Sequence, residues 1–189
     1  MKETNNNRAL PQSRYASESR TVMNELVLPN DTNTFGNLMG GKLLYWMDIC
    51  AAMAAQKHSG SIVVTASVDN VSFKQSIKLG EVLTIEAHVT RAFRTSMEVH
   101  MQVFAQNLPK GTKVKSNEAY YTFVAVDQDG SPQPVPALQP ESEQEIMFYN
   151  QAQQRRELRL ILAGKMKPED ASSLIDMLKI IPKGPAHND

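Results

Sequence analysis

The chain has 189 residues and a mass of 21.1 kDa, which is enough for one domain with an appendage and too short for two full domains. The 20 lysine and arginine residues balance the 20 aspartate and glutamate residues, so neither nucleic acid nor an anionic membrane is an expected partner. The one cysteine, Cys50, excludes an internal disulfide and a cysteine-rich zinc site. The sequence shows neither an apolar signal segment nor a run of about 18 apolar residues that would span a membrane, so we expect a cytoplasmic protein.

The N-terminal part of the sequence predicts a tail, a strand and a loop. Residues 1–18 contain few apolar side chains and are expected to be disordered, because little apolar burial would offset the entropy of ordering them. Residues 21–28 are compatible with a strand that ends before Pro29. The residues that follow include four turn formers, which are Asn30, Asp31, Asn33 and Gly36. A loop is therefore expected after this strand.

A helix is predicted over residues 40–58 and is expected to end at Ser59-Gly60. Its apolar positions recur at intervals of three and four, at Leu44, Met47, Ala51 and Ala54. From residue 62 the apolar period changes to two, which is typical of strands. Four segments alternate in this way, over about residues 62–68, 83–89, 97–105 and 119–125. The breaks between the last three are short and contain turn formers, so these segments are expected to form an antiparallel meander.

Charged segments follow the predicted strands. Residues 141–162 are predicted as a surface helix and residues 168–181 as a shorter amphipathic helix. One long helix and a curled antiparallel sheet form an α+β fold, in which the sheet must cover the apolar side of the helix. The sequence thus predicts three parts, namely a disordered tail (1–18), a main domain that includes the first C-terminal helix (19–163), and a helical or irregular tail (164–189).

Asp48 is a candidate for chemistry because it lies within an apolar helical stripe. It follows Leu44 by four residues and precedes Ala51 by three, so it falls in the sector of the helix that is expected to face the core. Removing a carboxylate from water costs several kcal/mol unless hydrogen bonds or a partner compensate it, so this position indicates either a structural hydrogen bond or a catalytic base. A slightly rotated helix would instead make Asp48 a residue at the boundary of the core.

The loop that begins at Asn30 leads into the pair Gly40-Gly41 at the predicted helix start. Two glycines allow another molecule to approach the backbone closely, and free N–H groups at a helix N-terminus stabilise negative charge. An oxyanion-binding site is one interpretation of this pair. A sharp turn or close packing is the more common reason for such a pair, and Asn33 is likewise more often a turn residue than a catalytic amide.

Taken together, these features form one continuous pattern. It reads Pro29-x-Asp31-Thr32-Asn33-x-x-Gly36-x-x-x-Gly40-Gly41-x-x-Leu44-x-x-Met47-Asp48. The pattern resembles the hotdog-fold acyl-CoA thioesterases of the cytosolic acyl-CoA hydrolase type. Further matching segments are residues 65–73, 80–81, 94–99, 124–127 and 135–136, so the resemblance covers roughly residues 21–160.

The resemblance implies a hotdog fold, a sheet wrapped around one long helix, which the apolar periodicity predicts independently. It also implies hydrolysis of fatty acyl-CoA to free acid and coenzyme A (CoA), without a metal or organic cofactor, at a site shared by two subunits. Asp48 of one subunit would act as general base or nucleophile, and Asn33 of the other would orient the water or the thioester carbonyl. The backbone N–H of Gly41 would hold the oxyanion.

Because CoA carries phosphates, basic and hydroxyl side chains are expected to contact it. The candidates are Lys74, Arg91, Arg94, Thr95 and Ser96. Candidates for the lining of the acyl pocket are Met39, Trp46 and Phe73. The histidines lack the spacing of metal ligands, so no metal is expected. Cys50 is expected to pack in the core, because no histidine is placed to activate its thiol.

A homodimer is the expected minimum, because a hotdog unit leaves a sheet edge exposed. The C-terminal helices predict a homohexamer, a trimer of dimers, as in similar proteins. Two other functions are open. A non-catalytic module that senses acyl-CoA would need neither Asn33 nor Asp48, and a dehydratase-type hotdog enzyme would typically have a catalytic histidine in the helix region, whereas His58 lies at its far end. The sequence does not predict the acyl-chain length.

Overall fold

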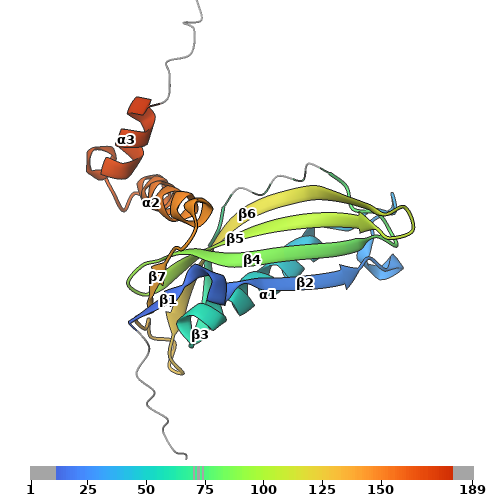
Figure 1. The fold of residues 1–189 in the computed structure, drawn as a ribbon, viewed down its shortest axis with the longest axis horizontal. Helices are drawn as coiled ribbons and strands as arrows, with labels where there is room; N and C mark the ends of the chain where they lie inside the picture. The colour runs from blue at the N-terminus through green and yellow to red at the C-terminus, as the bar shows by residue number, and fades with distance from the viewer. Residues whose placement is uncertain (1–11, 70, 72, 74, 181–189) are drawn as a thin grey trace, which may run out of the picture. The chain divides into compact units, whose positions relative to one another are not determined.

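The structure, a computed structural model, describes residues 12–69, 71, 73 and 75–180. The chain divides after Glu141 into two compact units. The elements of the first unit are β1 (Ser13–Tyr15), η1 (Ala16–Ser19), β2 (Thr21–Leu26), η2 (Pro29–Asp31), α1 (Gly40–Ser59), β3 (Ile62–Val68), β4 (Val82–Ala92), β5 (Ser96–Asn107), β6 (Thr112–Val126) and β7 (Ala137–Gln139) (Figure 1). Within the described residues, no helix combines the length and the hydrophobicity needed to cross a lipid bilayer.

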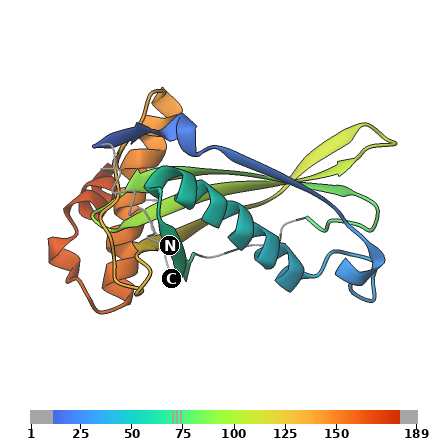
Figure 2. The ribbon, with the colours of Figure 1, turned by 90° about the horizontal axis from the view of Figure 1, so that it is seen from below.

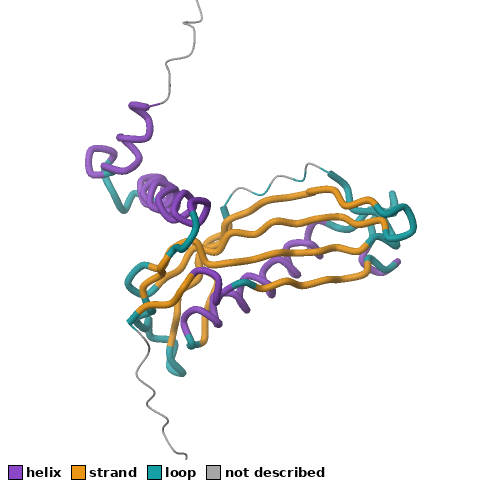
Figure 3. Tube along the Cα trace, viewed as in Figure 1, coloured by secondary structure: helices purple, strands orange, loops and turns teal. Residues whose placement is uncertain are grey.

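A five-stranded antiparallel sheet in the order β2-β4-β5-β6-β3 curves around α1 (Figures 2 and 3). The hairpins that join β4, β5 and β6 confirm the predicted meander. β3 pairs with β6, so β2 and β3 form the two edges of the sheet. Because α1 connects these two edge strands in the sequence, it must cross the concave side of the sheet. The predicted α+β arrangement is confirmed.

Small side chains let α1 pack closely on the sheet. Ala51, Ala54 and Ala55 are fully buried, and α1 contacts both β4 and β5. Alanine also has the highest helix propensity, so these residues favour the helix as well as its close approach to the sheet. The helix ends as predicted, because Gly60 adopts a left-handed conformation (φ 67°) that residues with a side chain rarely adopt.

The N-terminal residues differ from the prediction. We expected no structure before residue 19, but β1 pairs in parallel with β7, and η1 follows it directly. This segment binds the end of α1, where a guanidinium N–H of Arg14 donates to the backbone oxygen of Lys57. The Lys57 ammonium in turn donates to the backbone oxygen of Arg20 (2.8 Å). Pairing to a strand far away in the sequence and hydrogen bonds to a helix end order a segment that has few apolar residues.

The second unit contains α2 (Glu143–Leu162), η3 (Pro168–Asp170) and α3 (Ser172–Ile180). The predicted main domain of residues 19–163 includes α2, but α2 groups with α3 in the second unit. The reason is a long-range cap. Buried Glu157 of α2 accepts a hydrogen bond from the backbone N–H of Leu174 in the first turn of α3 (2.8 Å) and another from the Gln153 side chain (2.9 Å).

The burial of His58 in the folded chain is expected to make the stability of the protein depend on pH. Its ring is fully buried, and because a carbonyl oxygen can only accept, Nε2 donates the hydrogen bond to Pro136 O (2.9 Å). Burial lowers the pKa of His58 below its usual value of 6.5. The unfolded chain therefore binds a proton more readily than the folded chain, so this contribution to stability is complete above pH 6.5 and is lost progressively below it.

We therefore expect the Tm to fall as the pH is lowered from about 7 to about 5, and to fall less in His58→Gln than in the wild type. Thermal unfolding at each pH measures this difference. His88→Gln is the matched control, because His88 is only half-buried. An equally steep fall in His58→Gln would show that another group is responsible.

Candidate active site

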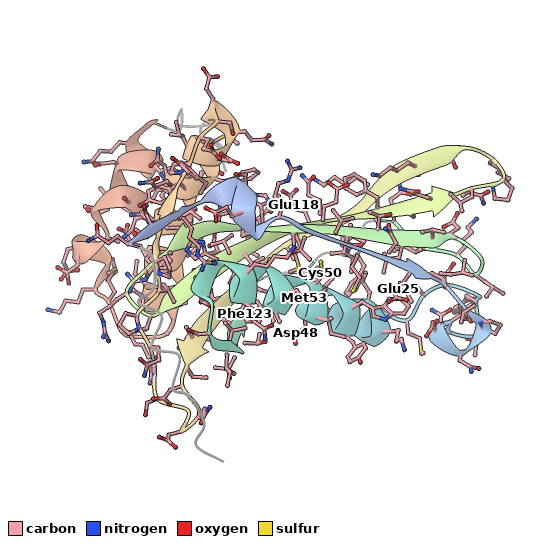
Figure 4. The ribbon with its side chains drawn as sticks, turned by 60° about the horizontal axis from the view of Figure 1, so that its bottom comes forward. Glu25, Asp48, Cys50, Met53, Glu118 and Phe123 are labelled. Atoms are coloured by element: carbon pink, nitrogen blue, oxygen red, sulfur yellow. The ribbon has the colours of Figure 1, made fainter. Side chains whose placement is uncertain are left out.

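Asp48 lies in the third turn of α1, at the border of the buried side of the helix. Its side chain is half-buried, and Thr65 Oγ1 on β3 donates a hydrogen bond to Asp48 Oδ1 (2.7 Å). A bulge in β3 shifts the strand register between Thr65 and Ser67. Figure 4 shows Asp48 and Cys50 leaving the helix on different sides. The boundary interpretation of Asp48 is therefore correct, and the carboxylate nevertheless has a specific partner.

Unlike the Asp48 carboxylate, the side chains of Tyr121 and Cys50 stay protonated at neutral pH. Burial raises the pKa of Tyr121 to about 12, and the negative charge of Asp48 contributes to this shift. Burial also raises the pKa of the Cys50 thiol to about 11, against a smaller opposing effect of Lys57. The Cys50 sulfur lies 3.7 Å from the backbone oxygen of Ile85. The prediction that Cys50 packs in the core is confirmed, and Asp48 remains the candidate base.

Asn33 is fixed by the loop that precedes α1. Its Oδ1 accepts hydrogen bonds from the backbone N–H groups of Phe35 (3.0 Å) and Asn37 (3.2 Å). The N–H of Gly36 donates to the backbone oxygen of Asn33 (2.9 Å). Asn33 is thus a turn residue, as its type favours. The same contacts fix its exposed carboxamide with the oxygen engaged, so the Nδ2 group is the part that can donate to another molecule.

The first turn of α1 is open to a ligand. The N-cap residue, Met39, provides no side-chain cap for the N–H groups of this turn. A Cβ atom at Gly40 would lie 3.3 Å from the ring of Phe73, whereas among the described residues nothing lies within 4 Å of a Cβ atom at Gly41. Gly40 therefore permits close packing, and Gly41 leaves its backbone accessible. A pocket of about 320 Å³ adjoins this turn and is lined by Asn33, Asn37, Leu38, Gly40, Leu43, Phe73, Gln75, Ser76 and Ile77.

Asp31 anchors the loop to the helix, which the sequence did not reveal. Its carboxylate is buried, with Oδ2 accepting a hydrogen bond from Leu28 N (3.1 Å) and Oδ1 paired with Lys42 Nζ (3.2 Å). Its backbone oxygen accepts from Met39 N (2.9 Å). These contacts span both ends of the loop, so they fix the position of Asn33 relative to the first turn of α1.

Within one protomer, the structure brings these residues together in two pairs. Asn33 adjoins the start of α1, and Asp48 contacts Thr65. Asp48 follows Gly40 by eight residues, which places it about 12 Å along the helix axis from the first turn. This separation exceeds the length of a hydrogen bond several times, so Asn33 and Asp48 of one chain do not form a joint site.

The candidate CoA contacts lie elsewhere in the fold. Arg91, Arg94, Thr95 and Ser96 lie at the end of β4 and in its connection to β5, and Lys74 lies outside the described residues. This connection meets the end of β6, where Ala125 N donates to Thr95 O (2.9 Å). β6 ends opposite Ile62, which lies three residues after the end of α1, so these side chains lie toward the C-terminal end of the helix. Of the acyl-pocket candidates, Phe73 lines the pocket at the helix start.

Two histidines lie closer together than their separate strands suggested. His88 of β4 and His100 of β5 are register partners, and their ring centroids are 5.2 Å apart. His100 Nε2 also forms a hydrogen bond with Glu118 Oε1 (2.6 Å). In the part of the chain that the structure describes, no three His, Cys, Asp or Glu side chains form a cluster suited to a metal ion.

Comparison with known proteins identifies the family. Residues 35–112 match the family model described as Thioesterase superfamily. The chain is 39% identical over 145 residues to a Bacillus subtilis protein named uncharacterized acyl-CoA thioester hydrolase YkhA, and this match covers 77% of the chain and 84% of that protein. The chain belongs to the hotdog-fold acyl-CoA thioesterases. This confirms the predicted family and the prediction of an acyl-CoA hydrolase.

Solved thioesterase structures share the fold. A hexameric acyl-CoA thioesterase in its apo form is 45% identical, with a TM-score of 0.78, and the match covers 81% of this thioesterase and 98% of that chain. The acyl-CoA hydrolase of Staphylococcus aureus, in complex with butyryl-CoA, CoA and CoA disulfide, is 36% identical, with a TM-score of 0.75, and the match covers 88% of this chain and 99% of that one. The hotdog fold is therefore confirmed.

Two further comparisons bear on this thioesterase. Three variants of the S. aureus hydrolase have been solved, in which alanine replaces an aspartate, a threonine or an asparagine. The chain is also 33% identical over 147 residues to the cytosolic acyl coenzyme A thioester hydrolase of mouse, covering 77% of the chain but only 39% of that longer protein. The names of these relatives favour a hydrolase over a dehydratase or a non-catalytic acyl-CoA sensor.

Proposed function

We propose that this thioesterase hydrolyses fatty acyl-CoA at a site shared by two protomers. One protomer provides Asp48 and Thr65, and the other provides Asn33 and the backbone N–H of Gly41. The observation that carries the proposal is the division of these groups into two pairs, with Gly41 and Asp48 about 10 Å apart along α1. Only a second copy can place an Asn33 amide beside Asp48.

The S. aureus variants support the choice of residues. Their altered positions are an asparagine, an aspartate fifteen residues further on, and a threonine seventeen residues beyond the aspartate. Asn33, Asp48 and Thr65 have the same two spacings in this chain. Thr65 was missing from our predicted site, and its hydrogen bond to Asp48 gives it a positioning role.

The proposed reaction uses one oxygen of Asp48 for chemistry. Thr65 holds Oδ1, and Oδ2 takes a proton from a water molecule while the water oxygen bonds to the thioester carbon. Asn33 Nδ2 and the N–H of Gly41 donate to the carbonyl oxygen as its negative charge develops. The C–S bond then breaks, and the CoA thiolate takes the proton from Asp48. In the alternative route, Asp48 Oδ2 attacks the thioester carbon itself and the C–S bond breaks to release the CoA thiolate. Water then hydrolyses the resulting anhydride to the free acid and the Asp48 carboxylate, and its remaining proton goes to the thiolate.

The proposed dimer covers apolar surfaces that one protomer leaves exposed. On α1, Tyr45 and Met53 are exposed, and on the edge strand β3 about half of each apolar side chain at Ile62, Val64 and Val68 is exposed. An unpaired edge strand with apolar side chains favours association, and a second copy would bury it. We propose a hexamer, a trimer of such dimers, as the complete assembly, and the similarity to a hexameric thioesterase supports it.

The contacts to CoA and the location of the protein are also proposals. One region at the end of β4 and the start of β5 contains Arg91, Arg94, Thr95 and Ser96. This grouping supports a role in binding the phosphates of a CoA molecule whose thioester lies in the site of a neighbouring protomer. A cytoplasmic location is supported by the similarity to the mouse hydrolase, which is named cytosolic.

A series of acyl-CoA substrates tests the proposed substrate class. Purified protein should release CoA from acetyl-, butyryl-, octanoyl- and palmitoyl-CoA, as measured with a thiol reagent. We expect kcat/KM to be on the order of tenfold higher for octanoyl-CoA than for acetyl-CoA, because added methylene groups would contact the exposed apolar side chains of α1. A preference for acetyl-CoA would contradict the fatty acyl assignment, and no release from any of the four would contradict the reaction itself.

A further inference from the structure

Phe35 is exposed to a degree that the single protomer does not explain. Its side chain is 86% exposed, the highest value among the large apolar side chains of the described residues. It belongs to the turn that carries Asn33, but it does not line the pocket beside that turn in its own protomer. Isolated apolar side chains on a surface are common, so exposure alone indicates nothing. The informative feature is the position of Phe35 in the loop before α1, two residues after Asn33.

Phe35 and Asn33 are parts of one rigid turn. The backbone N–H of Phe35 donates to Asn33 Oδ1 (3.0 Å), and Asn33 N donates to Asn37 O (2.8 Å). On the other side of the turn, Leu79 N donates to the backbone oxygen of Gly36 (3.0 Å). The Cα atoms at the two ends of such a turn lie within about 7 Å of each other. The Phe35 ring therefore keeps a fixed position close to the Asn33 carboxamide, and a partner surface that contacts Asn33 lies within reach of the ring.

In the proposed dimer, that surface is the side of the partner's α1 that its own sheet leaves uncovered. Apart from Asp48, this side carries Tyr45, Ile49, Ala52 and Met53, which are half-buried or exposed in the single protomer. Figure 4 shows Met53 on the same helix as Asp48, less than two turns further on. The thioester carbon must lie between Asn33 and Asp48, so an acyl chain leaving that carbon would pass between the Phe35 ring and these apolar side chains.

We propose that Phe35 of each protomer forms a wall of the acyl-binding site on its partner and determines selectivity for acyl-chain length. This inference rests on the proposed shared site. A fatty acyl chain of eight carbons extends far enough from the thioester to contact the ring, whereas an acetyl group ends next to the carbonyl carbon. The contribution of Phe35 therefore increases with chain length. Because the contact is remote from the reacting atoms, it contributes to KM more than to kcat.

The experiment compares Phe35→Ala with the wild type on acetyl-CoA and octanoyl-CoA. We expect the ratio of kcat/KM for octanoyl-CoA to that for acetyl-CoA to fall roughly tenfold, mainly through a higher KM for octanoyl-CoA. Phe35→Leu should retain most of the ratio, because it keeps an apolar side chain of intermediate size. Leu108→Ala is the matched control, since Leu108 is 65% exposed at the tip of the β5–β6 hairpin and should not change the ratio.

The outcomes separate this inference from the proposed function. An unchanged ratio in Phe35→Ala, or a ratio that rises, would overturn the proposal, because the ring would then be either remote from the chain or an obstacle to it. If Asp48→Asn keeps full activity toward both substrates, the proposed site itself is wrong, whatever Phe35→Ala does. Light scattering on Phe35→Ala should give the wild-type oligomeric state, so that a changed ratio cannot be attributed to loss of the shared site.

Discussion

Asp48→Asn is expected to lower kcat for acyl-CoA hydrolysis by about a thousandfold, because the amide can neither take a proton from water nor attack the thioester. The amide has nearly the same shape as the carboxylate and still accepts the hydrogen bond from Thr65 Oγ1, so the fold should be retained. The measurement is the rate of CoA release at saturating octanoyl-CoA, together with the Tm. A variant that unfolds would not count as support, which is why both readouts are needed.

Variants of Thr65 provide the control for this prediction. Thr65→Val keeps the shape but removes the hydroxyl donor, and about a tenfold fall in kcat is expected, because Asp48 loses the group that orients it. Thr65→Ser keeps a hydroxyl and should retain most of the activity. If Asp48→Asn is as active as the wild type, Asp48 is not the base or nucleophile, and the Asp48–Thr65 pair is only a structural contact.

The second large effect is a recovery of activity when two inactive variants are mixed. Asn33→Ala alone should lower kcat by about a hundredfold, because it removes a donor to the developing oxyanion. In a heterodimer of Asn33→Ala and Asp48→Asn chains, one site combines natural Asn33 with natural Asp48, and the other site has neither. Random pairing makes half of the dimers mixed, so about a quarter of all sites are intact.

The mixture should therefore regain about a quarter of wild-type activity after the two variants are unfolded together and refolded. Each variant carried alone through the same procedure is the control. If the wild type recovers its activity in the same procedure, a mixture no more active than its components would contradict the shared arrangement. Light scattering on the wild type gives the companion test, because a monomer with full activity would also exclude a shared site.

Local periodicity was sufficient to predict the long helix and most strands. The helix expected over residues 40–58 is α1, because a stripe at intervals of three and four and a terminal glycine are local signals. The pairing of β3 with β6 is not local, since the sequence period shows which side of a strand faces the core but not which strand lies beside it. The hydrogen bond between Thr65 and Asp48 depends on that placement, so Thr65 was missed.

The candidate site was predicted less completely than the fold. Successive helix residues differ by about 100° in direction, so spacing alone could not decide whether Asp48 faces the core or its border. For Asp31, the available signal was its position three residues after Leu28, where an aspartate can accept a hydrogen bond from the backbone of a turn. Its pairing with Lys42 joins separate elements and could not be seen in the sequence. The proposed role of Asn33 came from the family pattern, whereas the glycine pair at the helix start had already indicated an oxyanion-binding site as one interpretation.

The three buried alanines of α1 allow the helix to lie close to the sheet that carries Thr65. At such positions an added methyl group typically costs 1–3 kcal/mol, since a close-packed interface must move to make room. Moving the helix by even part of an ångström would lengthen the 2.7 Å contact that aims the carboxylate. If Asp48 acts as proposed, residues with no access to the substrate would thus influence the reaction through the distance between the helix and the sheet.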